Sequence, residues 1–397
     1  MGMLNEIREL QERELRSFFQ PILSLQTQRI IAYEALGRTV QGEKVRSLGP
    51  FFQNPEISDE QHLHVDRILR EQAIAAIAQS DSSALLFLNL KPSWIYRIYK
   101  ECGILPTLQF IQKHGLDPSR VVIEVTEEEF HGRLDELSAI INVYREQGCL
   151  IAIDDIGSGY SNYDRIASIR PNILKIDLKL LKKSAMHDGY KALLNSFSIL
   201  SSQMGSSLLI EGVETKQDLY YALKAGARYV QGFLFSEARQ GLQDERAYEP
   251  FLKEEIRLYT EQEMARYRAL FSVQDSLSEL IASDIHIGSV TDADKMIQSL
   301  LMSVGLNVVR IYICREDGCQ VSSNYTRDIE GEWKKDAQYQ GSNWIWRPYF
   351  IPNMMRLNNQ RQGMLSSEYT DLDTSRLMQT YSCPVGDTHY LFLDVQV

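Results

Sequence analysis

The chain has 397 residues, of which 44% are hydrophobic and 24% charged, a composition typical of folded globular proteins and not of disordered or fibrous ones. Its length favours two or more domains. Because 53 Asp and Glu residues outnumber 42 Lys and Arg residues, the net charge of -11 argues against broad binding to nucleic-acid polymers, whose phosphates it would repel.

The sequence carries no obvious membrane or export signal. No apolar run is long enough for a membrane span, and residues 1–17 are charged throughout, so we expect a cytoplasmic protein without signal peptide or membrane contact. Five cysteines, an odd count without any C-x-x-C pair, fit a reducing compartment and argue against a zinc ribbon.

Residues 18–235 alternate short apolar runs with polar loops and helical periodicity. The helical stretches are 61–79, 131–147, 189–203 and 216–226. The apolar runs are FFQPILSL at 18–25, IIAYEALGR at 30–38, LLFLNL at 85–90, VVIEVT at 121–126, LIAIDDI at 150–156, ILKID at 173–177, LLIEGV at 208–213 and YVQGF at 229–233. Such alternation predicts parallel strands joined by helices. With the first two runs counted as an opening hairpin, the total of about eight strands in this length matches a TIM-like (β/α) barrel in the α/β class.

After Tyr248 the pattern becomes one long amphipathic run, which predicts a helical linker over 249–282. The apolar residues at helical spacing are Leu252, Ile256, Tyr259, Tyr267, Leu270, Val273, Leu277 and Leu280. This stripe indicates either the seam of a homodimer or a face that packs on the barrel, and Glu263 interrupts a coiled-coil pattern.

Residues 283–397 are strand-like and aromatic-rich, with one helical stretch near 291–303. The strand-like runs are VVRIYIC, NWIWRPYF, QTYSCPV and HYLFLDV. We therefore expect a barrel at 1–248, a linker at 249–282, and a smaller α+β domain at 283–397 that regulates or dimerises the barrel. Trp344, Trp346, Arg347 and Tyr349 either line a pocket for a small ligand or form a hydrophobic core with one surface arginine.

Polar residues end the predicted strands, where a parallel barrel presents its reacting groups. They are Glu34, Asn89, Glu124, Asp154, Asp155, Lys175, Asp177, Glu211 and Gln231. Any one of them fits a salt bridge or a polar cap. As a set, carboxylates gathered at one barrel mouth would repel one another without a cation, and all-oxygen ligands suit Mg²⁺, Mn²⁺ or Ca²⁺ rather than Zn²⁺.

Asp154 and Asp155 are adjacent, yet the glycine-rich turn after them allows both carboxylates to reach one cation site. A pair of metal ions about 3.5–4 Å apart is the usual apparatus of phosphodiester hydrolysis. Lys175 either takes a proton from the attacking water, if the metals lower its pKa, or serves as a counter-ion to Asp177 or Asp155. Segment 156–161 is a candidate lid rather than a P-loop.

The motifs at these positions are, in chain order, FFQP, EALGR, NLKP, EVTE, DDIGSGYS, KID, EGVE and QGFLF. Over about residues 15–240 they resemble the EAL domain, a family of TIM-like barrels that hydrolyse cyclic di-GMP to linear pGpG. The order of barrel, long helix and aromatic-rich domain resembles the YkuI-like members of that family, whose C-terminal module has a PAS-like fold. Mild departures are Ile156 for the usual Phe, Asn172 for a common Asp, and SEA after QGFLF.

The resemblance implies a role for each matching residue. The metal ligands would be Glu34, Asn89, Glu124, Asp154 and Glu211, with Asp155 completing the second metal site. Catalysis would rest on Lys175, which activates the water, together with Glu34 and Glu211. The substrate would be bound by Gln20, Leu36, Arg38, Asp177, Glu214 and Gln231, the last also able to contact water or metal. Glu127 would anchor the loop that begins at Asp154.

Three functional hypotheses follow. The leading one is a homodimeric cyclic di-GMP phosphodiesterase that uses two Mg²⁺ or Mn²⁺ ions, is inhibited by Ca²⁺, and is regulated by its C-terminal domain. The alternative is a cyclic di-GMP receptor with slow or absent hydrolysis that passes a signal along the linker helix. A third, an unrelated metal-dependent barrel such as an aldolase or enolase, leaves Gln20, Arg38 and the EGVE motif unexplained.

Overall fold

The computed structural model of the chain describes residues 12–126, 133–156, 163–280, 287–328, 330–347, 350–360, 362–372, 374 and 376–396. The chain divides into two compact units, Met1–Thr260 and Glu261–Val397. One long helix, α11 (Glu249–Leu280), crosses that boundary. The three-part division at residues 248 and 282 stays a prediction. A search of the described residues finds no helix with the length and hydropathy needed to cross a membrane.

The first unit alternates strands and helices. Its strands are β1 (Leu15–Ser24), β2 (Arg29–Gln41), β3 (Lys44–Ser47), β4 (Leu85–Leu90), β5 (Val121–Val125), β6 (Leu150–Ile156), β7 (Ile173–Ile176), β8 (Ser207–Ile210) and β9 (Tyr229–Val230). Its helices are η1 (Glu12–Glu14), α2 (Gly49–Phe52), α3 (Asp59–Gln79), α4 (Pro92–Cys102), α5 (Pro106–His114), η2 (Pro118–Arg120), α6 (Leu134–Glu146), α7 (Tyr163–Ile169), α8 (Leu178–Met186), α9 (Asp188–Met204), α10 (Lys216–Lys224) and the start of α11.

The strands form a closed barrel. Among the described residues, the sheet order is β1-β9-β8-β7-β6-β5-β4-β2-β3, and β1 also pairs with β2, which closes a ring of eight strands with β3 outside it. Strand β1 runs antiparallel to both of its neighbours, β2 and β9. The other strands of the ring, β2 and β4 to β9, each run parallel to the next one. This confirms the predicted TIM-like barrel, with the opening hairpin supplying its one reversed strand.

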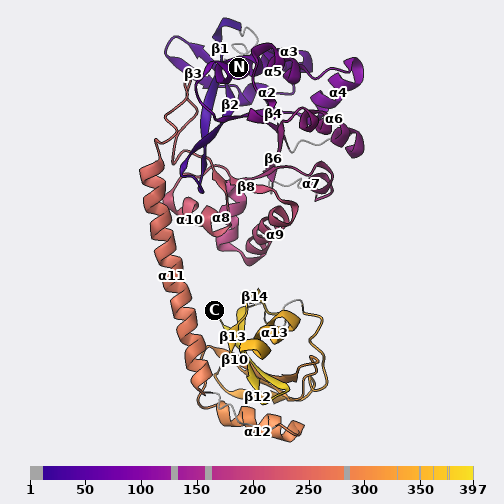
Figure 1. Cartoon of the computed structure of the whole chain (residues 1–397), viewed down its shortest axis with the longest axis vertical. Helices are drawn as coiled ribbons and strands as arrows, with labels where there is room; N and C mark the ends of the chain where they lie inside the picture. Colours follow the sequence, from indigo (N-terminus) through magenta and orange to yellow (C-terminus); the bar gives the residue numbers. More distant parts are fainter. Residues whose placement is uncertain are drawn as a thin grey trace. The chain divides into compact units, whose positions relative to one another are not determined.

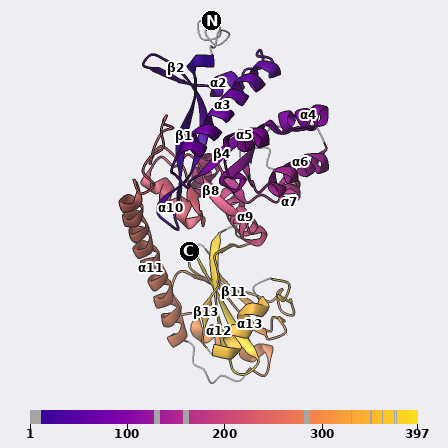
Figure 2. The same ribbon diagram turned by 45° about the horizontal axis from the view of Figure 1, so that its top comes forward.

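Two apolar layers explain why most strands are apolar at successive positions. One layer fills the barrel with a residue from each of seven strands: Ile22, Ala32, Phe87, Val122, Ala152, Ile173 and Leu209. The alternate residues point outward and pack against the surrounding helices, as Leu86, Ile123 and Ile151 do. Figures 1 and 2 show α3, α4, α6 and α9 outside the strands. The barrel interior is therefore a packed core below its mouth.

The second unit is an antiparallel sheet with a helix on each face. Its elements after α11 are α12 (Val290–Leu300), β10 (Val308–Arg315), β11 (Asn324–Arg327), β12 (Trp333–Asp336), α13 (Phe350–Gln360), β13 (Met364–Leu365), β14 (Tyr369–Thr370), β15 (Leu377–Val385) and β16 (His389–Gln396). Alternate residues of β16 pack with the two helices: Leu391 and Leu393 lie in the cluster of α12, and Phe392 lies with Phe350 of α13. The unit is thus the predicted smaller α+β domain.

The sequence interpretation of this unit was wrong in one segment. The run NWIWRPYF was expected to be a strand, but residues 344–347 form a turn and α13 begins at Phe350. The indole of Trp344 donates to Gln320 Oε1 at 2.9 Å, so the turn is fixed by a side-chain contact with a distant segment. Aromatic composition alone does not reveal such a contact.

The apolar stripe of α11 contacts both units near its ends. Leu252 is fully buried in the core of the first unit, and Leu277 is buried in the core of the second. Between them Met264, Tyr267 and Phe271 are each more than half exposed. The side chains of Leu270, Val273 and Leu280 lie outside the described residues. Packing on the barrel thus accounts for the first part of the stripe, and a homodimer seam stays a prediction for the middle.

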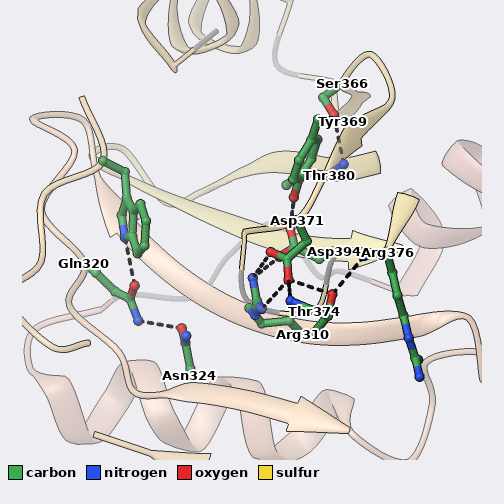
Figure 3. Close-up of polar contacts among 11 residues, drawn as sticks. Arg310, Gln320, Asn324, Ser366, Tyr369, Asp371, Thr374, Arg376, Thr380 and Asp394 are labelled. Carbon is green, nitrogen blue, oxygen red and sulfur yellow. Dashed lines mark hydrogen bonds and ion pairs between the residues drawn. The ribbon is translucent and has the colours of Figure 1, made fainter. Parts of the chain in front are cut away.

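A buried ionic cluster ties the loop after β14 to the sheet of the second unit. Arg310 of β10 donates to both carboxylate oxygens of Asp371, at 3.0 and 3.2 Å, and to Asp394 of β16 at 3.2 Å (Figure 3). Tyr369 and Thr380 hydroxyls donate to Asp394 Oδ1. Burial raises the pKa of Asp394 despite Arg310, whereas hydrogen bonds from Arg310 and Thr374 outweigh burial and lower the pKa of Asp371. One guanidinium thus compensates two carboxylates.

We expect Arg310→Met to destabilise the second unit by about 3–5 kcal/mol, because it leaves Asp371 and Asp394 buried without their cation. Urea denaturation followed by tryptophan fluorescence measures this, since Trp333, Trp344 and Trp346 all lie in this unit. The matched control is Arg315→Met, which removes an exposed ion pair with Asp317 at the end of the same strand. Equal unfolding midpoints for the two variants would contradict the prediction.

Candidate active site

The polar residues of the barrel mouth form one layer above the apolar filling. In the parallel strands, side chains two residues apart point to the same side, so each inward apolar residue is followed by an inward polar one. The polar residues two positions after the filling residues are Glu34, Asn89, Glu124, Asp154, Lys175 and Glu211. In the antiparallel β1 the direction reverses, and Gln20 precedes Ile22. The predicted convergence of these side chains is therefore a consequence of strand register.

Lys175 lies at the centre of this layer. Its side chain is fully buried, and its Nζ is 3.2 Å from Asp154 Oδ1, 3.3 Å from Glu211 Oε1 and 3.6 Å from Glu34 Oε2. It also contacts Glu124 Oε1, whose side chain is equally buried. One ammonium therefore compensates four carboxylates from four strands.

Amide side chains support the same carboxylates. Asn89 Nδ2 donates to Glu34 Oε1 at 2.8 Å, and Gln231 Nε2 donates to Glu34 Oε2 at 2.7 Å. Gln231 also donates to Gln20 Oε1 at 3.1 Å, and Gln20 in turn donates to the Ser236 backbone oxygen at 3.0 Å. These bonds join β1, β2, β4 and the turn after β9 across the mouth.

The electrostatics of the layer are those of a charge-paired, buried site. Burial raises the pKa of Glu124 well above its usual range, and Glu34 and Asp154 add to that effect while Lys175 opposes it. Burial is also the largest cause that raises the pKa of Glu211, and the charge of Asp154 raises it further. For Lys175, burial would lower the pKa, but the four carboxylates outweigh it and raise the pKa well above its usual range. Lys175 is therefore the charged counter-ion of these carboxylates here, and its role in activating water stays a prediction.

The donor set fits a divalent metal ion. Glu124 Oε2 is buried without a partner among the described residues, whereas Glu124 Oε1 and Glu211 Oε1 have only the Lys175 ammonium, and a further cation would relieve this costly state. The available ligand atoms are oxygens, which suit Mg²⁺, Mn²⁺ or Ca²⁺. Over the described ranges, no three His, Cys, Asp or Glu side chains are arranged to hold a metal ion as they stand, and the Lys175 ammonium contacts the carboxylates instead.

A cavity of about 590 Å³ opens beside this layer and is lined by Leu36, Arg38, Asn89 and Asp154. Arg38 Nη1 donates to the Gly37 backbone oxygen at 2.9 Å, and burial lowers the pKa of its guanidinium although Glu34 opposes this. The cavity therefore combines an apolar wall, a cation and the edge of the carboxylate layer.

Other predicted site residues lie apart from this cavity. Asp177 caps α8, its Oδ1 accepting from Lys179 N at 2.5 Å, and Glu214 is half exposed and pairs with Lys182 at 3.3 Å. Neither lines the 590 Å³ cavity. The side chain of Asp155, the loop anchor Glu127 and lid residues 157–161 lie outside the described residues.

Sequence reasoning missed part of the cavity wall. Phe52, Lys91 and Trp94 line it together with the predicted residues, yet none of them had been given a role. The available signal was the position of Lys91, directly after the strand that ends in Asn89-Leu90. A lysine between a strand and a helix resembles an ordinary surface residue, which explains the omission.

The aromatic residues singled out in the second unit take separate positions. Trp344 is bonded to Gln320, whose Nε2 donates to Asn324 Oδ1 at 2.9 Å (Figure 3), whereas Trp346 is 62% exposed. Arg347 lies over both indole rings, 4.9 Å and 5.4 Å from their centres. Tyr349 lies outside the described residues. A small-ligand pocket at this place stays a prediction.

Comparisons with known proteins agree with the motifs and the fold. A sequence model of the EAL domain matches residues 4–238, and one of the EAL-domain associated signalling protein domain matches residues 243–397. YkuI of Bacillus subtilis, described as an uncharacterized EAL-domain containing protein, is 33% identical over 381 residues, 95% of this chain and 93% of YkuI. PdeB of Escherichia coli, a probable cyclic di-GMP phosphodiesterase, is 28% identical over 58% of this chain and 43% of its own length.

Solved structures give the same result. The crystal structure of Bacillus subtilis YkuI, in complex with substrate cyclic di-GMP and calcium, has a TM-score of 0.88 and 32% identity, covering all of this chain and 98% of that one. BlrP1 of Klebsiella pneumoniae, in a manganese and cyclic di-GMP complex, has a TM-score of 0.52 and 28% identity over 59% of this chain and 58% of its own. The chain therefore belongs to the EAL-domain family and combines that domain with the associated domain found in YkuI.

Proposed function

We propose that this chain is a cyclic di-GMP phosphodiesterase that opens the cyclic dinucleotide to linear pGpG. The observation that carries the proposal is the inward layer of carboxylate and amide oxygens at one barrel mouth, where four carboxylates share the one Lys175 ammonium and Glu124 Oε2 has no partner among the described residues. Membership of the EAL family and the named phosphodiesterases among its relatives support the substrate class.

In this proposal, two divalent ions would be held by Glu34, Asn89, Glu124, Asp154 and Glu211, with Asp155 completing the second site. When bound, Mg²⁺ or Mn²⁺ would lower the pKa of a coordinated water and neutralise charge on the phosphate. Lys175 would keep the carboxylates of this layer together through its positive charge. Its use as a proton acceptor would require the carboxylate charges that raise its pKa to be compensated first.

The remaining residues would orient the substrate. Water adds to phosphorus as the bond to the ribose 3′-oxygen breaks, and the leaving oxygen takes up a proton, so the ring opens once. Arg38 lines the cavity with one N–H group engaged by Gly37, which leaves others for a phosphate oxygen. Leu36 provides an apolar wall for the nucleotide. Gln20 and Gln231 hold Glu34 in place and can contact water or substrate from the same side.

A second candidate function is that of a cyclic di-GMP receptor that binds without rapid turnover. It is favoured by the central place of the Lys175 ammonium, which compensates the carboxylates as they stand, and by the whole-length similarity to YkuI, solved in complex with substrate cyclic di-GMP and calcium. In either case the associated domain would regulate the barrel. A homodimer, a small ligand of that domain and a cytoplasmic location also remain predictions.

The first test measures turnover. With Mn²⁺, or Mg²⁺, and enzyme at a concentration near that of substrate, chromatography should show pGpG formed from cyclic di-GMP, and Ca²⁺ should suppress it. Glu34→Ala should reduce turnover to background while the circular dichroism spectrum stays unchanged. The reason is that Glu34 is a proposed metal ligand, which is held by an ion pair with Lys175 and by hydrogen bonds from Asn89 and Gln231. Glu101→Ala, at an exposed position of α4, is the control.

Tight binding of cyclic di-GMP in Ca²⁺ without turnover in Mn²⁺ or Mg²⁺ would select the receptor function. Absence of both binding and turnover would rule out both functions.

A second test concerns Lys175 as counter-ion. In EDTA, Lys175→Met should lower the free energy of unfolding by about 3–5 kcal/mol, because four carboxylates lose their buried cation. Added Mn²⁺ should then raise the melting temperature of the variant more than that of the parent chain. Lys113→Met, which removes an exposed pair with Glu71, is the control. A variant that melts like the parent in EDTA would show that Lys175 is not the counter-ion.

A third test addresses the associated domain. If it regulates or dimerises the barrel, removal of residues 283–397 should change either the turnover rate or the oligomer size. Cyclic di-GMP hydrolysis and light scattering measure these on the full chain and on the shortened chain in parallel. An unchanged rate together with an unchanged oligomer size would rule out both roles for the domain.

A further inference from the structure

Lys91 lies where β4 ends and α4 begins, two residues after Asn89. Its ammonium donates to the Phe52 backbone oxygen at 3.2 Å and lies 4.6 Å from the centre of the Trp94 ring. The side chain is half-buried and lines the same 590 Å³ cavity as Arg38 and Asn89. Lys91 therefore faces any ligand that occupies this cavity.

The support of Lys91 is well packed. Trp94 is only 7% exposed, and its ring lies 6.4 Å from that of Phe52 and 6.0 Å from that of His62. His62 is itself fixed by a 2.8 Å contact between Nε2 and the Phe51 backbone oxygen. A cation held against such a support keeps its position in the cavity, which favours recognition over a role as a solvated surface charge.

The charge of Lys91 acts on the carboxylate of Asp66 on the same cavity wall, where it opposes the rise in pKa that burial causes. In the part of the chain that the structure describes, its ammonium forms no ion pair, whereas Asp66 pairs with Arg70 and Asp154 contacts Lys175. An ammonium carries three N–H donors, and the Phe52 carbonyl accepts only one. A half-buried ammonium with unused N–H donors on a cavity wall is well placed to donate a hydrogen bond to an acceptor atom of the ligand.

The surroundings of Lys91 favour a base over a phosphate as that acceptor. The cavity is lined by the apolar side chains of Leu36, Leu48 and Phe52, which suit the flat face of a purine, and by the paired charges of Asp66 and Arg70. A phosphate at this place would lose water against apolar groups, and the guanidinium of Arg38 is the better phosphate partner because of its fork of donors.

We infer that Lys91 recognises the O6 and N7 edge of a guanine base of the ligand, and so selects guanine over adenine. This inference rests on the proposed binding of a cyclic dinucleotide. Guanine presents two acceptors on that edge, whereas adenine presents N7 beside an N6 amino donor. Because an ammonium has donors only, it can donate hydrogen bonds to both acceptors of guanine. At adenine, the amino group would face a cation that cannot accept a hydrogen bond from it.

Binding of cyclic di-GMP and cyclic di-AMP to the full chain in Ca²⁺, by calorimetry, tests this. The parent chain should prefer cyclic di-GMP. Lys91→Met should weaken cyclic di-GMP binding roughly 10-fold and leave cyclic di-AMP binding unchanged, so that the preference falls by the same factor. Lys91→Gln should reduce the preference further, because an amide can both donate and accept on the adenine edge. Lys100→Met, on the exposed side of the same helix, should change neither affinity.

The outcomes separate the inference from the proposed function. If the parent chain binds cyclic di-GMP and both Lys91 variants keep its preference, Lys91 does not read the base, while the proposed function stands. A loss of both affinities by equal factors has the same meaning, since a general loss of charge does not discriminate bases. If the parent chain binds neither nucleotide, the proposed function fails and the inference fails with it. Melting temperatures near that of the parent chain confirm that the variants are folded.

Discussion

The barrel mouth depends on one buried ammonium among four carboxylates. Without Lys175, the carboxylates of Glu34, Glu124, Asp154 and Glu211 would lie together in a region almost closed to water, where unpaired charge is very costly. The amides of Asn89 and Gln231 orient Glu34 within this arrangement. Charge balance therefore constrains which side chains the inward positions of the upper layer can carry, whereas the layer below is free to be apolar.

Much of the fold and of the site could be predicted because strand register links them. When an apolar run is buried on both faces and one polar residue follows an inward apolar residue by two positions, the run is a strand, and the polar residue marks its inward face and its upper end. This holds for Ala152 and Asp154 and for Phe87 and Asn89. The reversed direction of β1 also follows from its hairpin with β2.

The failures have a common physical cause, which is dependence on contacts distant in sequence. The turn at 344–347 carries aromatic residues typical of strands, but the Trp344 indole is fixed by Gln320. Lys91 looks like a surface lysine until α2 and Trp94 provide its support. The substrate-binding roles of Asp177 and Glu214 stay predictions; in the structure Asp177 caps the start of α8 and Glu214 pairs with Lys182. Position along a strand end does not decide which of these contacts a side chain adopts.

The antiparallel strand β1 has a consequence for how the chain folds. It closes the ring by pairing with β9, so Leu23 and Val230, roughly two hundred residues apart in sequence, become neighbours. Loop closure over such a distance is entropically costly and contributes to slow folding. During synthesis the ring cannot close until the segment around Gln231 has left the ribosome. The growing chain therefore carries Glu34, the first of these carboxylates, through about half of its synthesis before the mouth that brings them together exists.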